Sequence, residues 1–331
     1  MSELARQPNK TRACKASQLV RVVNVFDIEM EEGPGRDGFW FRAAELRPML
    51  GAARIGAGAY EAREGVPIWP YHYHYPDEEW LYVRAGAPVL RDGGGRHVLS
   101  TGDVVCFPPG HRGAHTLEGP GRFVIFSGER STGPFVSVYP DSDKISVFPG
   151  IEADGLNALQ FVRAGSVDYW HGEGDGPIPL ASVTREPEAP PGSPIVHARD
   201  LTFEPGEGWR WAPLGDAAGG QRLDAAVLEV NPGADFGPYR YEYGRELWLL
   251  VLAGAPTVQH AKGERALSPG DLVCLPEGPA GGRNVLNHSA EMARVLLLWT
   301  TGLPTAICYP ESGQWVLRTG READEIRLRP S

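Results

Sequence analysis

The chain contains one stretch of sequence twice, and this duplication constrains its fold more than any other feature. Residues 71–90 read YHYHYPDEEWLYVRAGAPVL and residues 239–258 read YRYEYGRELWLLVLAGAPTV, with eleven of the twenty positions identical at an offset of 168 residues. The same offset places GDVVCFPPG (102–110) on GDLVCLPEG (270–278). A motif set that occurs twice predicts two domains of one fold, and 331 residues are enough for two ordinary domains.

Within each copy the pattern is typical of short β-strands. The alternating segments YHYHY and WLYVRAG and the apolar runs DVVCF and FVIFS are bounded by Gly and Pro. The 42 Gly and 30 Pro residues suit many strands joined by tight turns better than a helical bundle. We therefore expect an all-β chain that forms two small barrels or jelly rolls.

The domain organisation follows from the positions of the two copies. We expect a polar N-terminal tail at 1–19, a first barrel at 20–165 and a second barrel at 195–331. Residues 166–194 are expected to wrap the first barrel and to end in the Pro-rich stretch TREPEAPPGSP (184–194), which is typical of an extended linker.

A cluster of metal-ligating residue types stands in the first copy. His72 and His74 are two residues apart on a predicted strand, so their side chains share one face. Glu79 follows five residues later, and His115 lies about forty residues further on. Three imidazoles and one carboxylate suit Fe(II), Mn(II), Ni(II), Cu(II) or Zn(II). We interpret the set as the site of one divalent transition metal ion, against the alternative that the histidines merely line a barrel.

Two neighbouring residues compete with members of this set. Glu78 precedes Glu79, but it is retained in the second copy as Glu246, which favours a structural role such as a turn hydrogen bond. His111 lies in the turn PPGHRG, where exposure is expected, so His115 is favoured as the ligand.

At the equivalent positions of the second copy, 168 residues later, all four candidate ligands are replaced by other residues. The replacements are Arg240, Glu242, Leu247 and Arg283. A guanidinium stays protonated and cannot ligate a metal, so we expect no metal of this kind in the second barrel. An Arg–Glu–Arg cluster should fill the place instead. It is either a structural network of ion pairs or a pocket in which the arginine forks bind a carboxylate or phosphate.

These motifs resemble those of the cupin superfamily, and their double occurrence resembles a two-domain bicupin of the quercetin-dioxygenase-like cupin 2 type. The first cupin motif, G-x5-H-x-H-x3/4-E-x6-G, is matched without its leading glycine by His72, His74, Glu79 and Gly86. The second motif, G-x5-P-x-G-x2-H-x3-N, is matched by Gly102, Pro108 and Gly110, with its histidine displaced by two positions to His115 and without its asparagine. The resemblance implies a jelly-roll barrel (double-stranded β-helix) of six to eight strands in each half, with a metal in the mouth of the first.

The resemblance does not specify the reaction, since cupins include dioxygenases, isomerases, lyases, decarboxylases and sugar-binding proteins. We expect a metal-dependent enzyme of a small-molecule substrate, with an Fe(II)-dependent, dioxygenase-like oxidoreductase favoured. One alternative is a non-oxidative isomerase, lyase or hydrolase, in which Glu79 transfers protons if it is not a tight ligand. Another is a non-enzymatic protein that binds a small molecule or sugar.

Charge and cysteine content exclude other classes of partner. A net charge of −10 without a Lys/Arg cluster argues against nucleic acid and anionic membranes. The chain has no run of 18 apolar residues and no apolar segment typical of a secretory signal near residue 1. Cys14, Cys106, Cys274 and Cys308 form no C-x-x-C pair, so we expect reduced thiols. These features predict a cytoplasmic protein, and a homodimer is one assembly that they allow.

Overall fold

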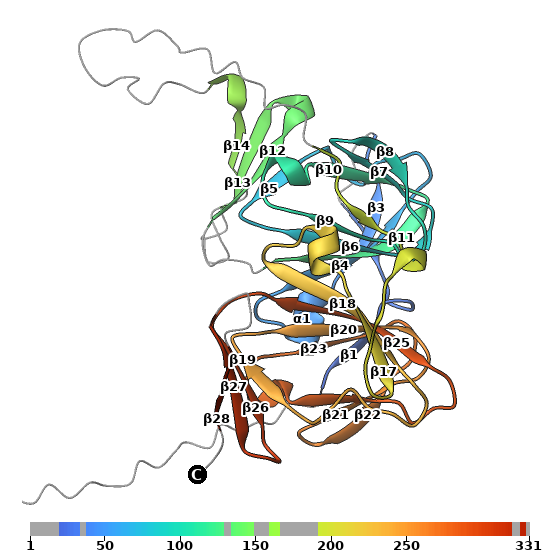
Figure 1. The fold of residues 1–331 in the computed structure, drawn as a ribbon. Helices are drawn as coiled ribbons and strands as arrows, with labels where there is room; N and C mark the ends of the chain where they lie inside the picture. The colour runs from blue at the N-terminus through green and yellow to red at the C-terminus, as the bar shows by residue number, and fades with distance from the viewer. Residues whose placement is uncertain are drawn as a thin grey trace, which may run out of the picture.

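The computed structural model describes residues 20–33, 38–128, 134–148, 159–165, 191–319 and 325–328. These residues form two β-barrels, which lie one above the other in Figure 1. Each barrel combines a seven-stranded, a four-stranded and a three-stranded antiparallel sheet, and the strands follow the same order in both. The prediction of an all-β chain with two tandem jelly-roll barrels is confirmed. The expected tail at 1–19, most of the wrap at 166–194 and Cys14 lie outside the described residues.

The first barrel is built mainly from the N-terminal half of the chain. Its large sheet contains, in spatial order, β15 (Ile195–Val196), β9 (Val104–Phe107), β6 (Glu79–Gly86), β11 (Gly121–Ser127), β4 (Gly56–Ala62), β3 (Phe41–Glu45) and β2 (Glu31–Glu32). The four-stranded sheet contains β14 (Leu159–Val162), β13 (Lys144–Phe148), β12 (Phe135–Tyr139) and β5 (Tyr73–Tyr75). The small sheet contains β10 (His115–Glu118), β7 (Val89–Asp92) and β8 (Gly95–Val98).

The second barrel repeats this arrangement. Its large sheet contains β1 (Val22–Asn24), β23 (Asp271–Leu275), β20 (Leu247–Ala253), β25 (Ala293–Thr300), β18 (Leu223–Val230), β17 (Trp209–Pro213) and β16 (Glu204–Pro205). The four-stranded sheet contains β19 (Tyr241–Tyr243), β26 (Thr305–Tyr309), β27 (Gln314–Arg318) and β28 (Glu325–Leu328). The small sheet contains β22 (Gly263–Ala266), β21 (Thr257–His260) and β24 (Arg283–Leu286).

Helical structure in the described residues is limited to short turns. The α-helical turns are α1 (Leu46–Leu50) after β3 and α2 (Gly215–Ala218) after β17. The 3-10 turns are η1 (His111–Gly113), η2 (Pro140–Ser142), η3 (Arg163–Gly165), η4 (Ala198–Asp200) and η5 (Pro279–Gly281). None of the described helices has the length and apolarity that a membrane crossing requires.

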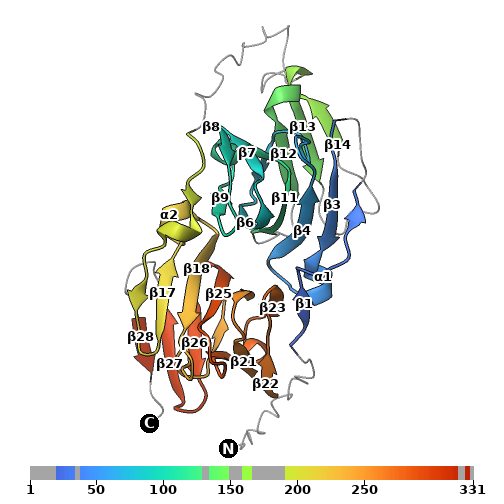
Figure 2. The same ribbon diagram turned by 90° about the vertical axis from the view of Figure 1, so that its right-hand side faces the viewer.

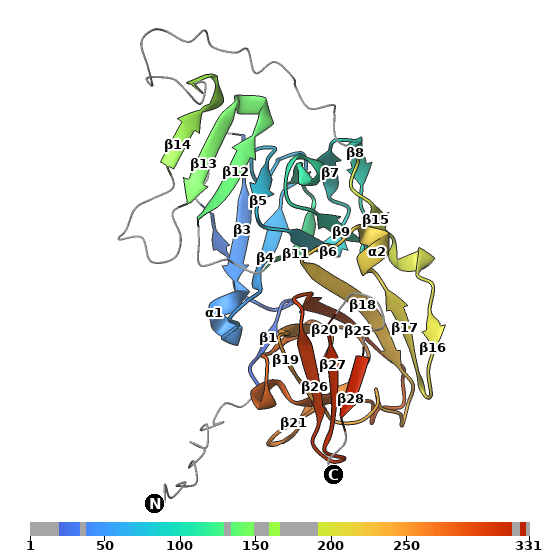
Figure 3. The ribbon, with the colours of Figure 1, turned by 60° about the vertical axis from the view of Figure 1, so that its left-hand side comes forward.

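The two barrels exchange one edge strand each, so the sheets do not divide at the boundaries expected at residues 20 and 195. Strand β1 pairs with β23 of the second barrel, with Val22 opposite Val273. Strand β15 pairs with β9 of the first barrel, with Ile195 opposite Val105. Figure 2 shows β1 running from the first barrel toward β23, and Figure 3 shows β15 beside β9. Each exchanged strand covers backbone groups that would otherwise form an open sheet edge.

The apolar runs in β6 and β20 arise because both faces of the large sheets are buried. In β6, Leu81 and Val83 belong to the core inside the first barrel, whereas Trp80 and Tyr82 belong to a core between the barrels. In β20 the alternate residue Trp248 faces that same inter-barrel core. Both sides of the strand are therefore removed from water, and a strictly alternating polar pattern is absent.

A buried carboxylate from each barrel binds the backbone of the other barrel. Glu78 accepts hydrogen bonds from the backbone N–H groups of residues 221–223 at 2.7–3.1 Å. Glu246 accepts the equivalent bonds from residues 53–55 at 2.8–3.1 Å. Each carboxylate also accepts a bond from the indole of the tryptophan two residues later, at 2.9 and 3.1 Å. Glu78 thus has the structural role that its retention in the second copy indicated, although the turn that it binds lies in the other barrel.

Candidate metal centre

Three strands of the first barrel bring the four candidate ligands together. His72 directly precedes β5 and forms an antiparallel bridge with His115, the first residue of β10. His74 lies on β5, and Glu79 is the first residue of β6. The bridge joins segments that are far apart in the sequence, and the alternation along β5 puts both of its histidines on the same side.

The ligating atoms of these residues lie at separations that suit a single ion. The Nε2 atoms of His72 and His74 are 2.9 Å apart. Oε2 of Glu79 is 3.5 Å from Nε2 of His74 and 3.4 Å from Nε2 of His115. Two ligands at right angles on an ion with bonds of about 2.1 Å are about 3 Å apart. The spacing therefore matches donors that share one metal.

Hydrogen bonds at the other ring nitrogen orient the imidazoles. The Nδ1 atoms of His72 and His115 each donate to the backbone carbonyl two residues earlier, at 2.8 Å. Because a carbonyl only accepts, Nδ1 carries the proton and Nε2 presents its lone pair to the centre. Nδ1 of His74 lies 2.8 Å from Oγ of Ser137 on β12, which can accept its proton in the same way.

Burial keeps the three imidazoles neutral. It lowers the pKa of both His72 and His74 to about 4, and repulsion from His74 adds to the shift at His72. The pKa of His115 is lowered well below its ordinary value, first by burial and then by His72. Burial also raises the pKa of Glu79, which His72 partly opposes. Neutral imidazole is the form that binds metals.

Two polar atoms of the cluster are buried without a hydrogen-bond partner, namely Oε2 of Glu79 and Nε2 of His115. Buried polar atoms in proteins are nearly always satisfied, so an orphaned pair at one point needs an explanation. A divalent metal ion would accept both lone pairs, and the chemistry of the donor set fits such an ion.

Aromatic rings surround the imidazoles. Phe107 stacks on His115 with ring centroids 3.7 Å apart, and Tyr139 stacks on His72 at 5.7 Å. Trp69 meets the edge of His72 at 5.8 Å, and Phe135 approaches His74 at 6.3 Å. Sequence analysis did not identify these rings or Ser137. Phe135, Tyr139 and Ser137 come from β12 and its end, more than sixty residues after the histidines that they contact, whereas Trp69 lies only three residues before His72. The ligand atoms of His72, His74 and Glu79 all lie within 4.8 Å of one another, and both His115 and its rival His111, in η1, fall outside this close set. His115 joins it only through Glu79, at 3.4 Å.

The replacements in the second barrel occupy equivalent positions. Arg240 forms a bridge with Arg283 just as His72 does with His115. Arg283 donates to Oε1 of Glu242 at 2.6 Å, and Nε of Arg240 lies 3.9 Å from the same oxygen. Leu247 packs in the core of the second barrel.

A third arginine belongs to the second-barrel cluster. Nη1 of Arg245 lies 3.1 Å from Oε2 of Glu242, three residues earlier in the chain. Sequence analysis missed it because the 168-residue comparison followed only the ligand positions. The signal in the sequence that could have identified Arg245 was its position three residues after Glu242.

Comparisons with known proteins agree with the fold. A family model described as Cupin domain matches residues 61–127, which contain all four candidate ligands. No curated protein matches the chain. Among solved structures, the oxalate decarboxylase of Lactobacillus farciminis in complex with formate is 15% identical with a TM-score of 0.51, covering 85% of this chain and 86% of that chain.

Two further structures show the same similarity. A variant of the Bacillus subtilis oxalate decarboxylase is 15% identical with a TM-score of 0.51, covering 86% of this chain and 78% of that chain. An oxalate decarboxylase studied for its substrate binding mode is 14% identical with a TM-score of 0.52, covering 92% and 86%. At such identities the likeness concerns the fold, and it extends over both barrels. The first barrel thus contains a cupin domain, and the second barrel repeats its frame, so that the chain has the two-barrel fold of a bicupin.

Proposed function

We propose that this bicupin is a metal-dependent enzyme whose reaction takes place in the first barrel. The ion would be held by His72, His74, Glu79 and His115. The observation that carries the proposal is the close set of donor atoms from His72, His74 and Glu79, with His115 beside Glu79. Among the described residues, Oε2 of Glu79 and Nε2 of His115 are buried and have no hydrogen-bond partner. Four protein ligands on an octahedral ion leave two positions for small molecules, as a catalytic rather than a closed structural site requires.

The reaction that we favour is the Fe(II)-dependent oxygenation of a small organic substrate. Iron would bind an electron-rich, chelating substrate at the two open positions and polarise it for reaction with O2. The residues of the chain orient and protect this chemistry. The hydrogen bonds at Nδ1 fix the imidazole planes, and the surrounding aromatic rings restrict water. Glu79, whose pKa is raised by burial, can hold or release a proton at Oε2 when it is not a tight ligand.

The metal site is tested by elemental analysis of protein purified without chelators. We expect about one equivalent of metal in the unmodified chain and a loss of nearly all of it in the His72→Ala/His74→Ala variant. Arg240→Gln, at the position in the second barrel that corresponds to His72, is the matched control and should retain the metal. Unchanged metal content in the double histidine variant would refute the site.

The reaction class is tested by oxygen uptake. Protein loaded anaerobically with Fe(II) is supplied with catechol, acetylacetone or quercetin, which are electron-rich molecules that chelate a metal through two oxygen donors. We expect O2 to be consumed in proportion to one of these substrates and to see no turnover without O2. Turnover that is independent of O2 would eliminate the oxygenase.

Non-oxidative decarboxylation is a second candidate, since the structures that share the fold across both barrels are oxalate decarboxylases. Protein loaded with Mn(II) and supplied with oxalate would then release CO2 without net consumption of O2. That result would replace the oxygenase by a decarboxylase. Metal binding without either reaction would instead favour a small-molecule-binding protein.

A further inference from the structure

The cluster in the second barrel contains more positive charge than its carboxylate neutralises. Arg240, Arg245 and Arg283 surround Glu242, and Asp224 is close enough to Arg245 to raise its pKa. Three guanidinium groups and two carboxylates leave one positive charge. The arginine side chains are only 7–19% exposed and that of Glu242 is 4% exposed. This excess is local, because the whole chain carries a net charge of −10.

The hydrogen bonds within the cluster leave part of this charge unsatisfied. Arg283 is well paired with Glu242, at 2.6 Å. Arg240 is paired less well, since its Nε lies 3.9 Å from the carboxylate of Glu242. Within the described residues, its Nη1 donates to the carbonyl of Phe236, at 3.3 Å. The pair of Arg245 and Glu242 is close but not aligned as a hydrogen bond, and Nε of Arg245 is buried without a partner. Buried cations in this state are costly unless another anion joins them.

The pKa shifts of the arginines agree with this geometry. Burial lowers the pKa of Arg240, and the neighbouring charge of Arg283 lowers it further. Burial also lowers the pKa of Arg245, although Glu242 opposes the shift. An additional negative group beside these arginines would stabilise their charged forms.

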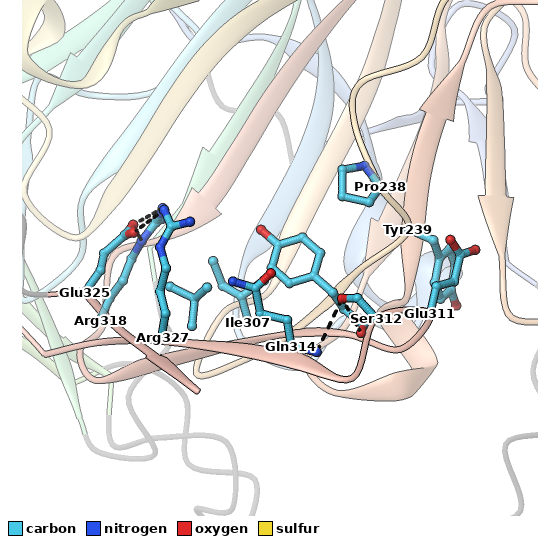
Figure 4. Close-up of a pocket in the computed structure, with 11 residues that line it drawn as sticks. Pro238, Tyr239, Ile307, Glu311, Ser312, Gln314, Arg318, Glu325 and Arg327 are labelled. Carbon is cyan, nitrogen blue, oxygen red and sulfur yellow. Dashed lines mark hydrogen bonds and ion pairs between the residues drawn. The ribbon is translucent and has the colours of Figure 1, made fainter. Parts of the chain in front are cut away.

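A cavity of about 380 Å³ lies next to the cluster along the sheet, because Ile307, which lines it, pairs with Glu242. Figure 4 shows its lining, to which the four cluster residues do not belong. Tyr309 and Arg318 line this cavity, and both are close enough to Arg240 to influence its pKa. Tyr239 lines it as well and lies close to Arg283. Ile307 and Gln314 contribute apolar and polar surface to the remaining wall. The carboxylates of Glu311 and Glu325 also line it, and Glu325 pairs with Arg318 at 2.8 Å and with Arg327 at 3.2 Å. The volume lies in the range of sites for small ligands.

We propose that the second barrel binds a small organic anion without a metal. Its carboxylate or phosphate group would lie against Arg240 and Arg245 beside the Arg283–Glu242 pair, and its uncharged part would occupy the cavity against Tyr239 and Tyr309. The guanidinium fork suits both kinds of oxyanion, because it offers two parallel donors to two oxygens.

The proposal is tested with inorganic phosphate and succinate, each titrated calorimetrically into the full chain and followed by thermal unfolding. We expect saturable binding of at least one of the two, a rise in the unfolding temperature, and no binding of uncharged succinamide. The stronger of the two anions indicates whether the natural ligand is a phosphate or a carboxylate. In Arg240→Gln the affinity should fall at least tenfold, whereas Arg265→Gln, which removes an exposed arginine of β22, should leave it unchanged.

Absence of saturable binding of either anion would overturn the proposal, and so would binding that Arg240→Gln does not weaken. The cluster would then be a network of ion pairs alone. Arg318→Gln, at the edge of the cavity, is a second variant that should weaken binding severalfold if Arg240→Gln does not fold. The His72→Ala/His74→Ala variant should lose metal but bind the anion normally, so that failure of the metal site and failure of the anion site are distinguishable.

Discussion

The two barrels use one frame to place different side chains at the same positions. In the first, the bridge between His72 and His115 holds neutral imidazoles whose lone pairs point to a common centre. In the second, the equivalent bridge between Arg240 and Arg283 holds permanent cations. The backbone pairing is the same, so the frame determines where the side chains meet and the side chains alone determine what they attract.

The carboxylate of each cluster reflects this difference. Burial raises the pKa of Glu79, and among the described residues the only group that opposes this shift is His72, which is not a permanent cation. Burial acts in the same direction on Glu242, but Arg283, Arg245 and Arg240 together lower its pKa. Glu79 therefore lacks a compensating positive charge from the groups that shift its pKa, and the proposed metal ion would supply one, whereas three arginines already compensate Glu242.

The largest expected effect comes from giving the first barrel a residue of the second. In Glu79→Leu, which copies Leu247, we expect metal affinity to fall by more than about 100-fold, because loss of a partner that only orients a ligand already costs 10–100-fold. Titration of the metal-free protein, read by metal analysis after dialysis, measures this. The reverse exchange, Leu247→Glu, should leave the metal content unchanged. If Glu79→Leu keeps its metal, the contrast between the barrels does not rest on these residues.

The next effect tests the symmetry of the frame. Glu78→Ala and Glu246→Ala should each lower the free energy of unfolding by about 3 kcal/mol, because each leaves several buried backbone N–H groups without an acceptor. Urea unfolding measures both, with Glu311→Ala on the exposed surface as the control. Losses that differ by more than about 2 kcal/mol would show that the barrels do not depend on each other equally.

A smaller effect concerns the support of one ligand. Ser137→Ala removes the hydroxyl beside Nδ1 of His74, and we expect a loss of about tenfold in metal affinity with the fold unchanged. Ile307 occupies the corresponding position on β26, opposite Glu242. Ile307→Ser should therefore have no effect on metal binding. An unchanged affinity in Ser137→Ala would mean that packing alone orients His74.

The smallest effect is a pH dependence confined to the first barrel. In metal-free protein the pKa of His72 and of His74 is about 4, below the ordinary value of about 6.5. The unfolded chain therefore takes up more protons between these values, and stability falls as the pH drops from about 6.5 to 4. Replacing both histidines by Gln should reduce this fall by a few degrees in unfolding temperature, as measured by calorimetry at several pH values. Arg240→Gln should keep the original slope, and an equal slope in all three proteins would contradict the prediction.

Much of the frame could be predicted from the sequence because its signals are local or repeated. The spacing of His72 and His74 defines one strand face, and the 168-residue offset shows which residues belong to the frame. The exchanged strands β1 and β15 could not be predicted, since two or three residues carry no periodicity and their partners lie in the other barrel. The role of Ser137 could not be predicted for a similar reason, because its contact with His74 depends on the pairing of β12 with β5.

The exchange of β1 and β15 also governs how the molecule can be divided. A cut in the segment before β15 would produce an N-terminal fragment that carries β1, an edge strand of the second barrel. The same fragment would lack β15, an edge strand of the first barrel. Neither fragment would then correspond to an autonomous unit, although each carries a complete copy of the repeat. Such halves are suited to complementation, in which two inactive pieces restore each other on mixing. The two copies of the repeat thus form one structural unit. A substitution in an exchanged strand of one copy would therefore affect the stability of the other barrel.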